Sequence, residues 1–313
     1  MKVLVTGGAG FIGSHLCDRL IGAGHKLWCV DNLYLGRETN IQHLLPDPSF
    51  NFCKLDVLDR SNMDKLFGQV GFDTVFHLAA NSDIRQGSKN HAVDLTLNFL
   101  TTFEILENMH KHGVKKIVFA GTSAIFGNTD APLVEDYGPL KPVSFYGASK
   151  LAAEAYISVF SSFYDITAKV IRFPNVVGSR STHGVIYDFI ERLRKDPTNL
   201  IVLGDGKQAK PYIYVDDLID AIMLIATSCG GRLETYHVGN NDVTTVRCIA
   251  EIVVEQMGLG DIPIHYTSQS IGWRGDVPKF FYNFDKVKKL GFANKFNSTQ
   301  AVELAVKKLV CGE

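Results

Sequence analysis

Tyr146 and Lys150 stand four residues apart and are the side chains best suited to proton transfer. On a helix, that spacing places both side chains on one face. A tyrosine ordinarily titrates at about pH 10, and a neighbouring ammonium group favours the phenolate that a general base needs. Surface helices often carry such a pair by chance. This pair gains weight from its place at the start of a predicted helix over 145–164, after the fifth predicted strand.

Two hydroxyl groups, on Thr122 and Ser123, directly follow that strand, which is predicted over 114–121. Doubly wound folds place their sites at the carboxyl ends of strands, so these hydroxyls are candidates for contact with a substrate. The alternative is that they only cap a turn. The tyrosine and lysine that follow favour a site.

A glycine-rich turn joins the first predicted strand to the first predicted helix, with Gly7, Gly10 and Gly13 at regular spacing. Gly7 and Gly10 let the backbone turn tightly and approach a pyrophosphate, and Gly13 lets the helix lie close to the strand. The amino end of the helix offers free N–H groups to an anion. A glycine-rich turn without a ligand is the alternative, and the strand–turn–helix context argues against it.

The choice of dinucleotide depends on Asp31, which ends the second predicted strand 18 residues after Gly13. A carboxylate there can accept both ribose hydroxyls of NAD and repels the 2′-phosphate of NADP. Arg37 lies six residues further on and would favour NADP, but Asp31 carries more weight. The sequence therefore predicts NAD.

The elements that must position these residues alternate along the first half of the chain. Short apolar runs bounded by Gly, Asp or Asn predict buried strands, and helical patterns lie between them. The predicted strands cover 2–6, 27–31, 50–54, 73–78, 114–121 and 167–173, and the predicted helices 11–23, 60–67, 91–111 and 145–164. Such alternation predicts an α/β fold with a Rossmann-type doubly wound parallel sheet.

After residue 175 the alternation loosens, which predicts a smaller C-terminal α/β substrate lobe. Short strands are predicted near 200–203, 212–214, 234–239 and 262–266, with helices near 185–194, 216–228, 245–257 and 298–310. We expect an NAD-binding domain over 1–175 and a nucleotide-sugar-binding lobe over 176–313, with the chain crossing back near 205–235.

Composition excludes several classes of protein. The 313 residues include 32 basic and 33 acidic side chains, and a net charge of −1 argues against nucleic acid as a partner. The six cysteines include no C-x-x-C pair, which argues against a zinc site, so no metal is expected. Scattered single cysteines indicate reduced thiols, and hence a cytoplasmic protein. No apolar run approaches the length of a membrane span, so no membrane association is expected.

Together these motifs resemble the extended short-chain dehydrogenase/reductase family. Within it they are most similar to the nucleotide-sugar epimerase/dehydratase branch, and there to the UDP-glucose 4-epimerase type. The resemblance is carried by Gly7–Gly13, Asp31, Leu55–Val57, His77–Ala80, Thr122, Tyr146, Lys150 and Arg172–Gly178, and it continues through Gly204–Gln208, Tyr212–Asp217 and Gly275-Asp276.

The resemblance implies a role for each matching residue. Tyr146 would be the base, Lys150 would bind the nicotinamide ribose and tune the tyrosine, and Thr122 would contact the substrate hydroxyl. The cofactor would be held by Gly7, Gly10, Phe11, Ile12, Gly13, Asp31, Asn32, Asp56, Val57, Leu78, Ala79, Ala80, Asn98, Tyr146 and Lys150. The substrate would be held by Thr122, Ser123, Asn175, Lys210 and Arg274, where Lys210 replaces the family's usual arginine.

Departures from the family pattern bear on the reaction. Sugar 4,6-dehydratases carry Asp-Glu directly after the catalytic threonine, and UDP-glucuronate decarboxylases carry Glu at the second position. Here the two residues are Ser123 and Ala124. We therefore expect an NAD-dependent 4-epimerase of a UDP-hexose or UDP-uronic acid. One alternative is a dehydratase or decarboxylase, if a carboxylate such as Asp83 or Glu135 reaches the site. The others are a net oxidoreductase, which would require added NAD, and a non-catalytic NAD-binding protein.

The predicted helix over 91–111 is apolar on several faces, which indicates burial on more than one side. One side must cover the sheet. The other could meet a second subunit, as in the two-fold dimers of the family, so we expect a homodimer.

Overall fold

A seven-stranded parallel sheet forms the centre of the molecule, of which the computed structural model describes residues 1–129, 131–267 and 282–312. The strands run in the order β11-β6-β5-β4-β1-β2-β3 and every neighbouring pair is parallel. Their bounds are β1 Lys2–Thr6, β2 Lys26–Asp31, β3 Phe50–Lys54, β4 Thr74–His77, β5 Lys116–Ala120, β6 Thr167–Arg172 and β11 Leu233–His237. The predicted doubly wound parallel sheet is confirmed.

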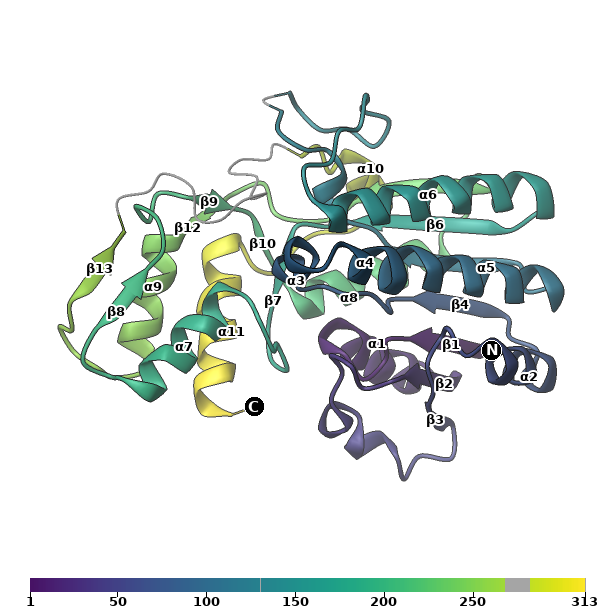
Figure 1. Cartoon of the computed structure of the whole chain (residues 1–313), viewed down its shortest axis with the longest axis horizontal. Helices are drawn as coiled ribbons and strands as arrows, with labels where there is room; N and C mark the ends of the chain where they lie inside the picture. The colour runs from purple at the N-terminus through teal and green to yellow at the C-terminus, as the bar shows by residue number, and fades with distance from the viewer. Residues whose placement is uncertain (130, 268–281, 313) are drawn as a thin grey trace.

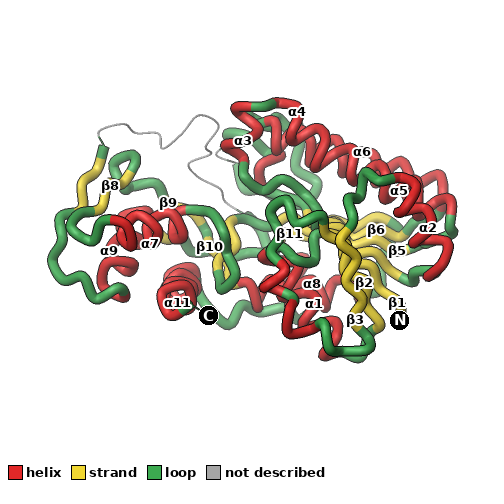
Figure 2. The backbone as a smooth tube through the Cα atoms, turned by 60° about the horizontal axis from the view of Figure 1, so that its bottom comes forward, coloured by secondary structure: helices red, strands yellow, loops and turns green. Residues whose placement is uncertain are grey.

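Helices cover both faces of this sheet because its strands are apolar on both sides (Figure 2). Along β1, Val3 and Val5 pack into one core with α1 (Phe11–Gly22) and α8 (Val215–Thr227). Leu4, which points the other way, packs into a second core with helices on the opposite face. Those helices are α2 (Arg60–Val70), α5 (Thr101–Lys111) and α6 (Phe145–Tyr164).

A smaller group of elements from the C-terminal part of the chain lies beside the sheet (Figure 1). Three two-stranded pairs belong to it: β7 (Asn175–Val177) with β10 (Tyr212–Tyr214), β8 (Leu200–Val202) with β13 (Ile264–Tyr266), and β9 (Ala209–Lys210) with β12 (Thr244–Thr245). Its helices are α7 (Val185–Lys195), α9 (Val246–Gln256) and α11 (Ser298–Cys311). The chain returns to the sheet between these elements, because α8 packs on α1 and β11 pairs with β6.

The predicted helix over 91–111 is interrupted. It consists of α4 (His91–Asp94), a π-helical segment η3 (Leu95–Leu100) and α5. Such π-helical turns are rare and occur frequently at functional sites. Two short helices that the sequence did not predict also appear, α3 (Ile84–Lys89) and α10 (Asp285–Lys289). The structure also contains the short 3₁₀ turns η1 (Glu38–Asn40), η2 (Gln42–Leu44) and η4 (Ser123–Ile125).

Within the described ranges, the structure holds no helix with both the length and the apolar character that crossing a membrane requires.

Gly13 provides a test of how tightly α1 is packed. A Cβ at this position would lie 2.1 Å from the carbonyl oxygen of Gly7. We therefore expect Gly13→Ala to lower the free energy of unfolding by about 1–3 kcal/mol, as overpacking does elsewhere. Gly22, at the other end of the same helix, is the matched control, because a Cβ there would meet nothing within 4 Å. Gly22→Ala should leave stability unchanged or raise it by about 0.5–1 kcal/mol. Urea unfolding measures both variants, and equal effects would contradict the packing argument.

Candidate active site

A cavity of about 580 Å³ lies at the carboxyl ends of the central strands. Residues at or just after the ends of β1, β2, β4 and β5 form one wall, among them Gly7, Asp31 and Leu78. The far wall comes from the smaller group of elements, for example Arg192 on α7 and Lys210 on β9. The cavity therefore joins the two parts of the molecule at the edge where doubly wound sheets bind their ligands.

The glycine turn forms one end of this cavity. Gly7 has a φ of +72°, and a Cβ on it would lie 2.7 Å from the backbone nitrogen of Ala79. The first residue of α1 is Phe11, and Gly10 before it offers no side chain to cap the helix. The N–H groups at this end of α1 are thus available to an anion such as a pyrophosphate.

Asp31 is held rigidly beside this turn. It is 8% exposed, and its carboxylate accepts N–H groups from Ala9 at 3.0 Å and Leu33 at 2.8 Å. Burial raises the pKa of Asp31, and these two hydrogen bonds oppose the rise. Nearby, the Asn32 amide donates to Asp56 at 2.8 Å. A fixed carboxylate next to a bare glycine turn fits the ribose and pyrophosphate of the predicted NAD.

The predicted cofactor and substrate residues almost all meet in the cavity wall. Of the described residues, those that line it include Gly7, Gly10, Phe11, Ile12, Gly13, Asp31, Asn32, Asp56, Val57, Leu78, Ala79, Ala80, Thr122, Ser123, Tyr146, Lys150, Asn175 and Lys210. Asn98 is not among the lining residues that the structure describes. Arg274 lies outside the described residues.

Asn98 is buried behind the wall, where it supports α6. Its amide nitrogen donates to the Ser149 hydroxyl at 3.0 Å and to Asp94 at 3.2 Å. Ser149 in turn donates to the Tyr146 carbonyl at 2.8 Å. The amide oxygen of Asn98 accepts the N–H of Asn81 at 2.7 Å. The π-helical turn that carries Asn98 directs its side chain to α6, which a regular helical pattern does not reveal.

Tyr146 lies in the first turn of α6, where the Ser144 hydroxyl caps the helix by accepting the N–H of Gly147 at 3.0 Å. The side chains of Thr122 and Tyr146 both line the cavity. Burial raises the pKa of Tyr146 to about 12, its interaction with Thr122 lowers it, and the charge of Asp94 raises it. The phenol thus needs a positive neighbour before it can act as a base near neutral pH.

Lys150 lies one helical turn further on and is 2% exposed. Its Nζ donates to the Ala120 carbonyl at 3.1 Å and lies 4.6 Å from the centre of the Phe119 ring. Burial lowers the pKa of Lys150 to about 8, and Glu154 opposes the fall. Glu154 is itself buried in an ion pair with Arg172 at 2.7 Å. Its spacing of four residues from Lys150 was the signal in the sequence that could have found it.

Asp94 is a buried carboxylate that the sequence analysis did not single out. Its Oδ1 accepts the amides of Asn81 at 2.8 Å and Asn98 at 3.2 Å, and burial raises its pKa. His77 also lies behind the site, between the hydroxyls of Thr6 at 2.7 Å and Thr102 at 3.0 Å. Burial lowers the pKa of His77 to about 3, so it stays neutral and serves as a packing and hydrogen-bonding residue.

Asp83 and Glu135, the two carboxylates that could act on the substrate from elsewhere in the chain, occupy different places. Asp83 lines the cavity. Glu135 instead accepts the backbone N–H of His237 at 3.1 Å and is not one of the described lining residues. Among the described residues, no group of three or more His, Cys, Asp or Glu side chains could hold a metal ion.

The burial of Lys150 yields a pH-dependent prediction. Its pKa of about 8 in the folded protein lies below its ordinary value of 10.5. Below pH 8 the folded state holds a buried charge at a cost, so Lys150→Met should raise the free energy of unfolding by about 1–3 kcal/mol at pH 7. As the pH rises through that pKa, the folded protein loses the proton before the unfolded chain does, and the wild-type protein regains stability.

Urea unfolding of the cofactor-free proteins at pH 7 and at pH 10 tests this difference. The advantage of Lys150→Met should shrink at the higher pH. Lys65, exposed on α2, is the control, and Lys65→Met should change stability by no more than about 0.5 kcal/mol at either pH. A Lys150→Met protein that is less stable at pH 7 would show that the ammonium is well paired.

Comparison with known proteins places these features in context. The model of the NAD dependent epimerase/dehydratase family matches residues 3–239. A UDP-glucose 4-epimerase of Mycolicibacterium smegmatis is 33% identical, over 84% of this chain and 85% of that protein. A UDP-N-acetyl-alpha-D-glucosaminuronate decarboxylase of Bacillus cytotoxicus is 31% identical, over 92% and 91%.

Solved structures are equally similar. A UDP-glucose 4-epimerase of Thermotoga maritima with UDP-glucose superposes with a TM-score of 0.89 at 32% identity, covering 100% of this chain and 99% of that one. A UDP-glucose 4-epimerase of Thermus thermophilus in complex with NAD has a TM-score of 0.86 at 31% identity, covering 98% of both chains. Relatives of similar identity bear the names of an epimerase and a decarboxylase, so the residues of the site must distinguish the reactions.

Proposed function

This chain belongs to the NAD-dependent epimerase/dehydratase family, and we propose that it is a nucleotide-sugar 4-epimerase acting on a UDP-hexose or UDP-uronic acid. Membership of the family confirms the resemblance inferred from the motifs, and NAD is its cofactor. The observation that carries the proposed reaction is the meeting of Thr122, Tyr146 and Lys150 in one cavity whose adjoining residues, Ser123 and Ala124, bring no carboxylate.

The proton chemistry belongs to Tyr146 and its neighbours. When bound at the glycine-lined end, NAD supplies a hydride acceptor and donor and a positively charged ring. The Tyr146 phenolate removes the proton of the sugar C4 hydroxyl and later returns it, and Thr122 donates a hydrogen bond to the same oxygen. Burial raises the pKa of Tyr146. In the proposed mechanism the ammonium of Lys150, on the same face of α6, and the positive ring of bound NAD would favour the phenolate.

The residues after Thr122 favour epimerisation over the related reactions. Elimination across C5–C6 and decarboxylation at C5 need an acid or base beside C5 once C4 is oxidised. Ser123 and Ala124 provide none. The alternative activity is that of a dehydratase or decarboxylase that uses Asp83. It is supported by the position of Asp83 in the cavity wall. A non-catalytic NAD-binding protein has no need for the complete set of threonine, tyrosine and lysine.

The far end of the cavity suits the nucleotide diphosphate. We propose that Asn175 and Lys210 hold it, with Arg274 as a further contact. Lys210 lies in β9, which pairs with β12, so a short ladder fixes its backbone at the cavity wall. A lysine offers a point charge instead of a bidentate fork. In this proposal, residues 1–175 bind NAD and residues 176–313 bind the nucleotide sugar.

The proposed reaction is tested by incubating the purified protein with a panel of UDP-sugars without added cofactor. We expect one UDP-hexose or UDP-uronic acid to be converted to its C4 epimer, with unchanged mass and no net NADH. Tyr146→Phe should fold, retain NAD and lose about 10²–10⁴ in rate. Tyr164→Phe is the matched control, because Tyr164 ends the same helix and is not among the described residues that line the cavity. Near-normal turnover of Tyr146→Phe would refute the mechanism.

Deuterated water separates epimerisation from its rivals. Breaking and remaking only the C4–H bond transfers no solvent proton to carbon, so the product should contain no carbon-bound deuterium. A product lighter by water or carbon dioxide, or deuterium at C5, would contradict the 4-epimerase proposal. If the protein instead removes water or carbon dioxide and Asp83 is the acid or base, Asp83→Asn should abolish that loss. The substitution should leave epimerisation at C4 in place.

We also propose that the protein is a homodimer formed through η3 and α6. Large apolar side chains remain exposed on these neighbouring elements: Leu95 (52%), Leu100 (38%), Tyr156 (43%), Val159 (53%) and Phe163 (75%). An apolar surface of this kind on a helix pair favours association. Residues on the side of α6 that faces the sheet, such as Ile157, are fully buried.

Sedimentation of Val159→Glu/Phe163→Glu tests the dimer. Two charges in the proposed interface should shift the protein to a monomer, while the cofactor content stays the same. Val243→Glu is the control, because Val243 is 49% exposed and lies in a loop before β12. A wild-type protein that sediments as a monomer at micromolar concentration would refute the proposal.

We further propose that the protein acts in the cytoplasm. All six cysteines lie in the described part of the chain and are free, although the sulfur atoms of Cys17 and Cys29 both lie beside Gly8. Adjacent reduced thiols suit a reducing compartment.

A further inference from the structure

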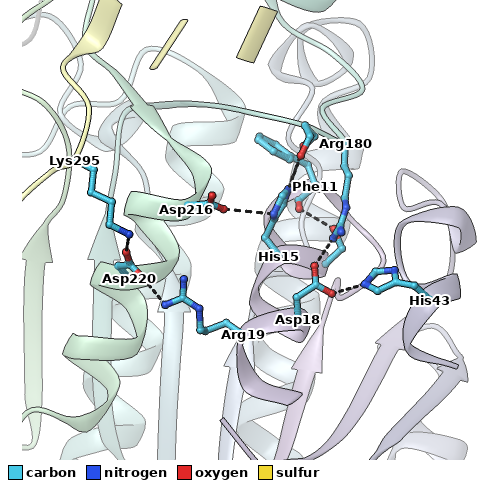
Figure 3. Close-up of polar contacts among 11 residues, drawn as sticks. Phe11, His15, Asp18, Arg19, His43, Arg180, Asp216, Asp220 and Lys295 are labelled. Carbon is cyan, nitrogen blue, oxygen red and sulfur yellow. Dashed lines mark hydrogen bonds and ion pairs between the residues drawn. The ribbon is translucent and has the colours of Figure 1, made fainter. Parts of the chain in front are cut away.

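The loop between β7 and α7 lines the proposed nucleotide-sugar end of the cavity. Gly178 and residues 181–184 of this loop lie in the wall, and α7, which begins at Val185, continues it. The middle of the loop, Ser179 and Arg180, faces α1 instead (Figure 3). The helix that begins at the glycine turn is therefore also the support of the loop.

Arg180 makes the stronger of the two contacts. Its Nη1 donates to Oδ2 of Asp18 on α1 at 2.8 Å, and Oδ1 of Asp18 accepts from the His43 ring at 2.7 Å. The Arg180 backbone has a φ of +64°, a left-handed conformation that is unfavourable for a residue with a side chain. A strained backbone persists only where its surroundings hold it, and here the charged side chain is tied to a rigid helix.

His15 makes the second contact, one helical turn before Asp18. Its Nε2 donates to the Ser179 carbonyl at 3.2 Å, and its Nδ1 lies 3.7 Å from Asp216 at the start of α8. Burial and the charge of Arg180 lower the pKa of His15, so the ring stays neutral and keeps its proton on Nε2, facing an oxygen that can only accept. The ring also packs edge-on against Phe11, which lines the cavity.

We propose that Arg180 is a positioning residue for the nucleotide sugar: through Asp18 it fixes the loop over 178–184 and the start of α7 in the conformation that receives the substrate. The part of this proposal that concerns substrate rests on the proposed function. An ion pair between exposed side chains contributes little to stability. This pair differs because it holds a strained backbone position in a loop that forms the cavity wall.

The chain offers a matched control for the pair. Arg19, the next residue on α1 after Asp18, forms an ion pair with Asp220 of α8, and Asp220 also accepts from Lys295 at 2.6 Å (Figure 3). Its exposure of 43% exceeds the 25% of Arg180, and it ties α1 to α8 instead of to the loop. A general effect of losing a charge from α1 or its partners would appear in Arg19→Ala as well.

Two measurements on the holoenzyme test the proposal. The first is the calorimetric affinity for UDP and for UDP-glucose, which requires no turnover. We expect Arg180→Ala and Asp18→Ala each to weaken binding by about tenfold, and Arg19→Ala by no more than about twofold. Because the two residues act as one unit, the double variant should be no weaker than either single variant, instead of about a hundredfold weaker.

The second measurement is hydrogen–deuterium exchange of peptides that cover residues 178–186, which needs no ligand. Exchange should become faster in Arg180→Ala and in Asp18→Ala and stay unchanged in Arg19→Ala. If only Arg180→Ala weakens binding, Arg180 contacts the ligand directly and the proposal is wrong. Unchanged affinity and exchange in both variants would also overturn it. If the wild-type protein binds neither UDP nor UDP-glucose, the proposed function fails, and the exchange data alone decide whether Arg180 holds the loop.

Discussion

The close approach of α1 to the ends of β1 and β4 is the constraint on which the rest of the site depends. It is possible only where residues lack side chains, because a Cβ on Gly13 would meet the Gly7 carbonyl and a Cβ on Gly7 would meet the backbone of Ala79. Packed in this way, α1 directs its amino end into the cavity and offers its next two turns to other elements. One rigid helix thereby supports the cofactor end of the cavity and, through His15 and Asp18, the loop at the other end.

The part of the cavity that holds Tyr146 and Lys150 buries two ionisable groups at a cost in stability. Burying the Lys150 ammonium lowers its pKa to about 8, and burying the Tyr146 phenol raises its pKa to about 12. Each shift means that the folded protein disfavours the charged form, although general-base action needs the phenolate and gains from the ammonium. The buried pair of Glu154 and Arg172 lessens the conflict because the Glu154 carboxylate stabilises the charge on Lys150. Active sites often retain such local instability.

The strands of the large sheet and most of its helices could be predicted from the sequence, because apolar runs and 3.6-residue periodicity report directly on burial. The glycine turn, Asp31 and the pair of Tyr146 and Lys150 were also predictable, since local spacing fixes their geometry. Asn98 was different, because a π-helical turn rotates its side chain toward Ser149 and periodicity does not register such a turn. The contact between Asp18 and Arg180 joins residues 162 positions apart and has no local signature.

The proposed 4-epimerisation depends on keeping carboxylates away from the sugar as much as on bringing Tyr146 to it. Oxidation at C4 makes the proton on C5 acidic, so any free carboxylate beside C5 would remove it and lead to elimination. Ser123 and Ala124 carry no such group. The Glu135 carboxylate accepts a hydrogen bond from the backbone N–H of His237. Asp83 does line the cavity, so it is the described carboxylate whose removal tests the proposed reaction. A site that must return the C4 proton without disturbing C5 therefore needs a single base, and in the proposed mechanism that base is Tyr146.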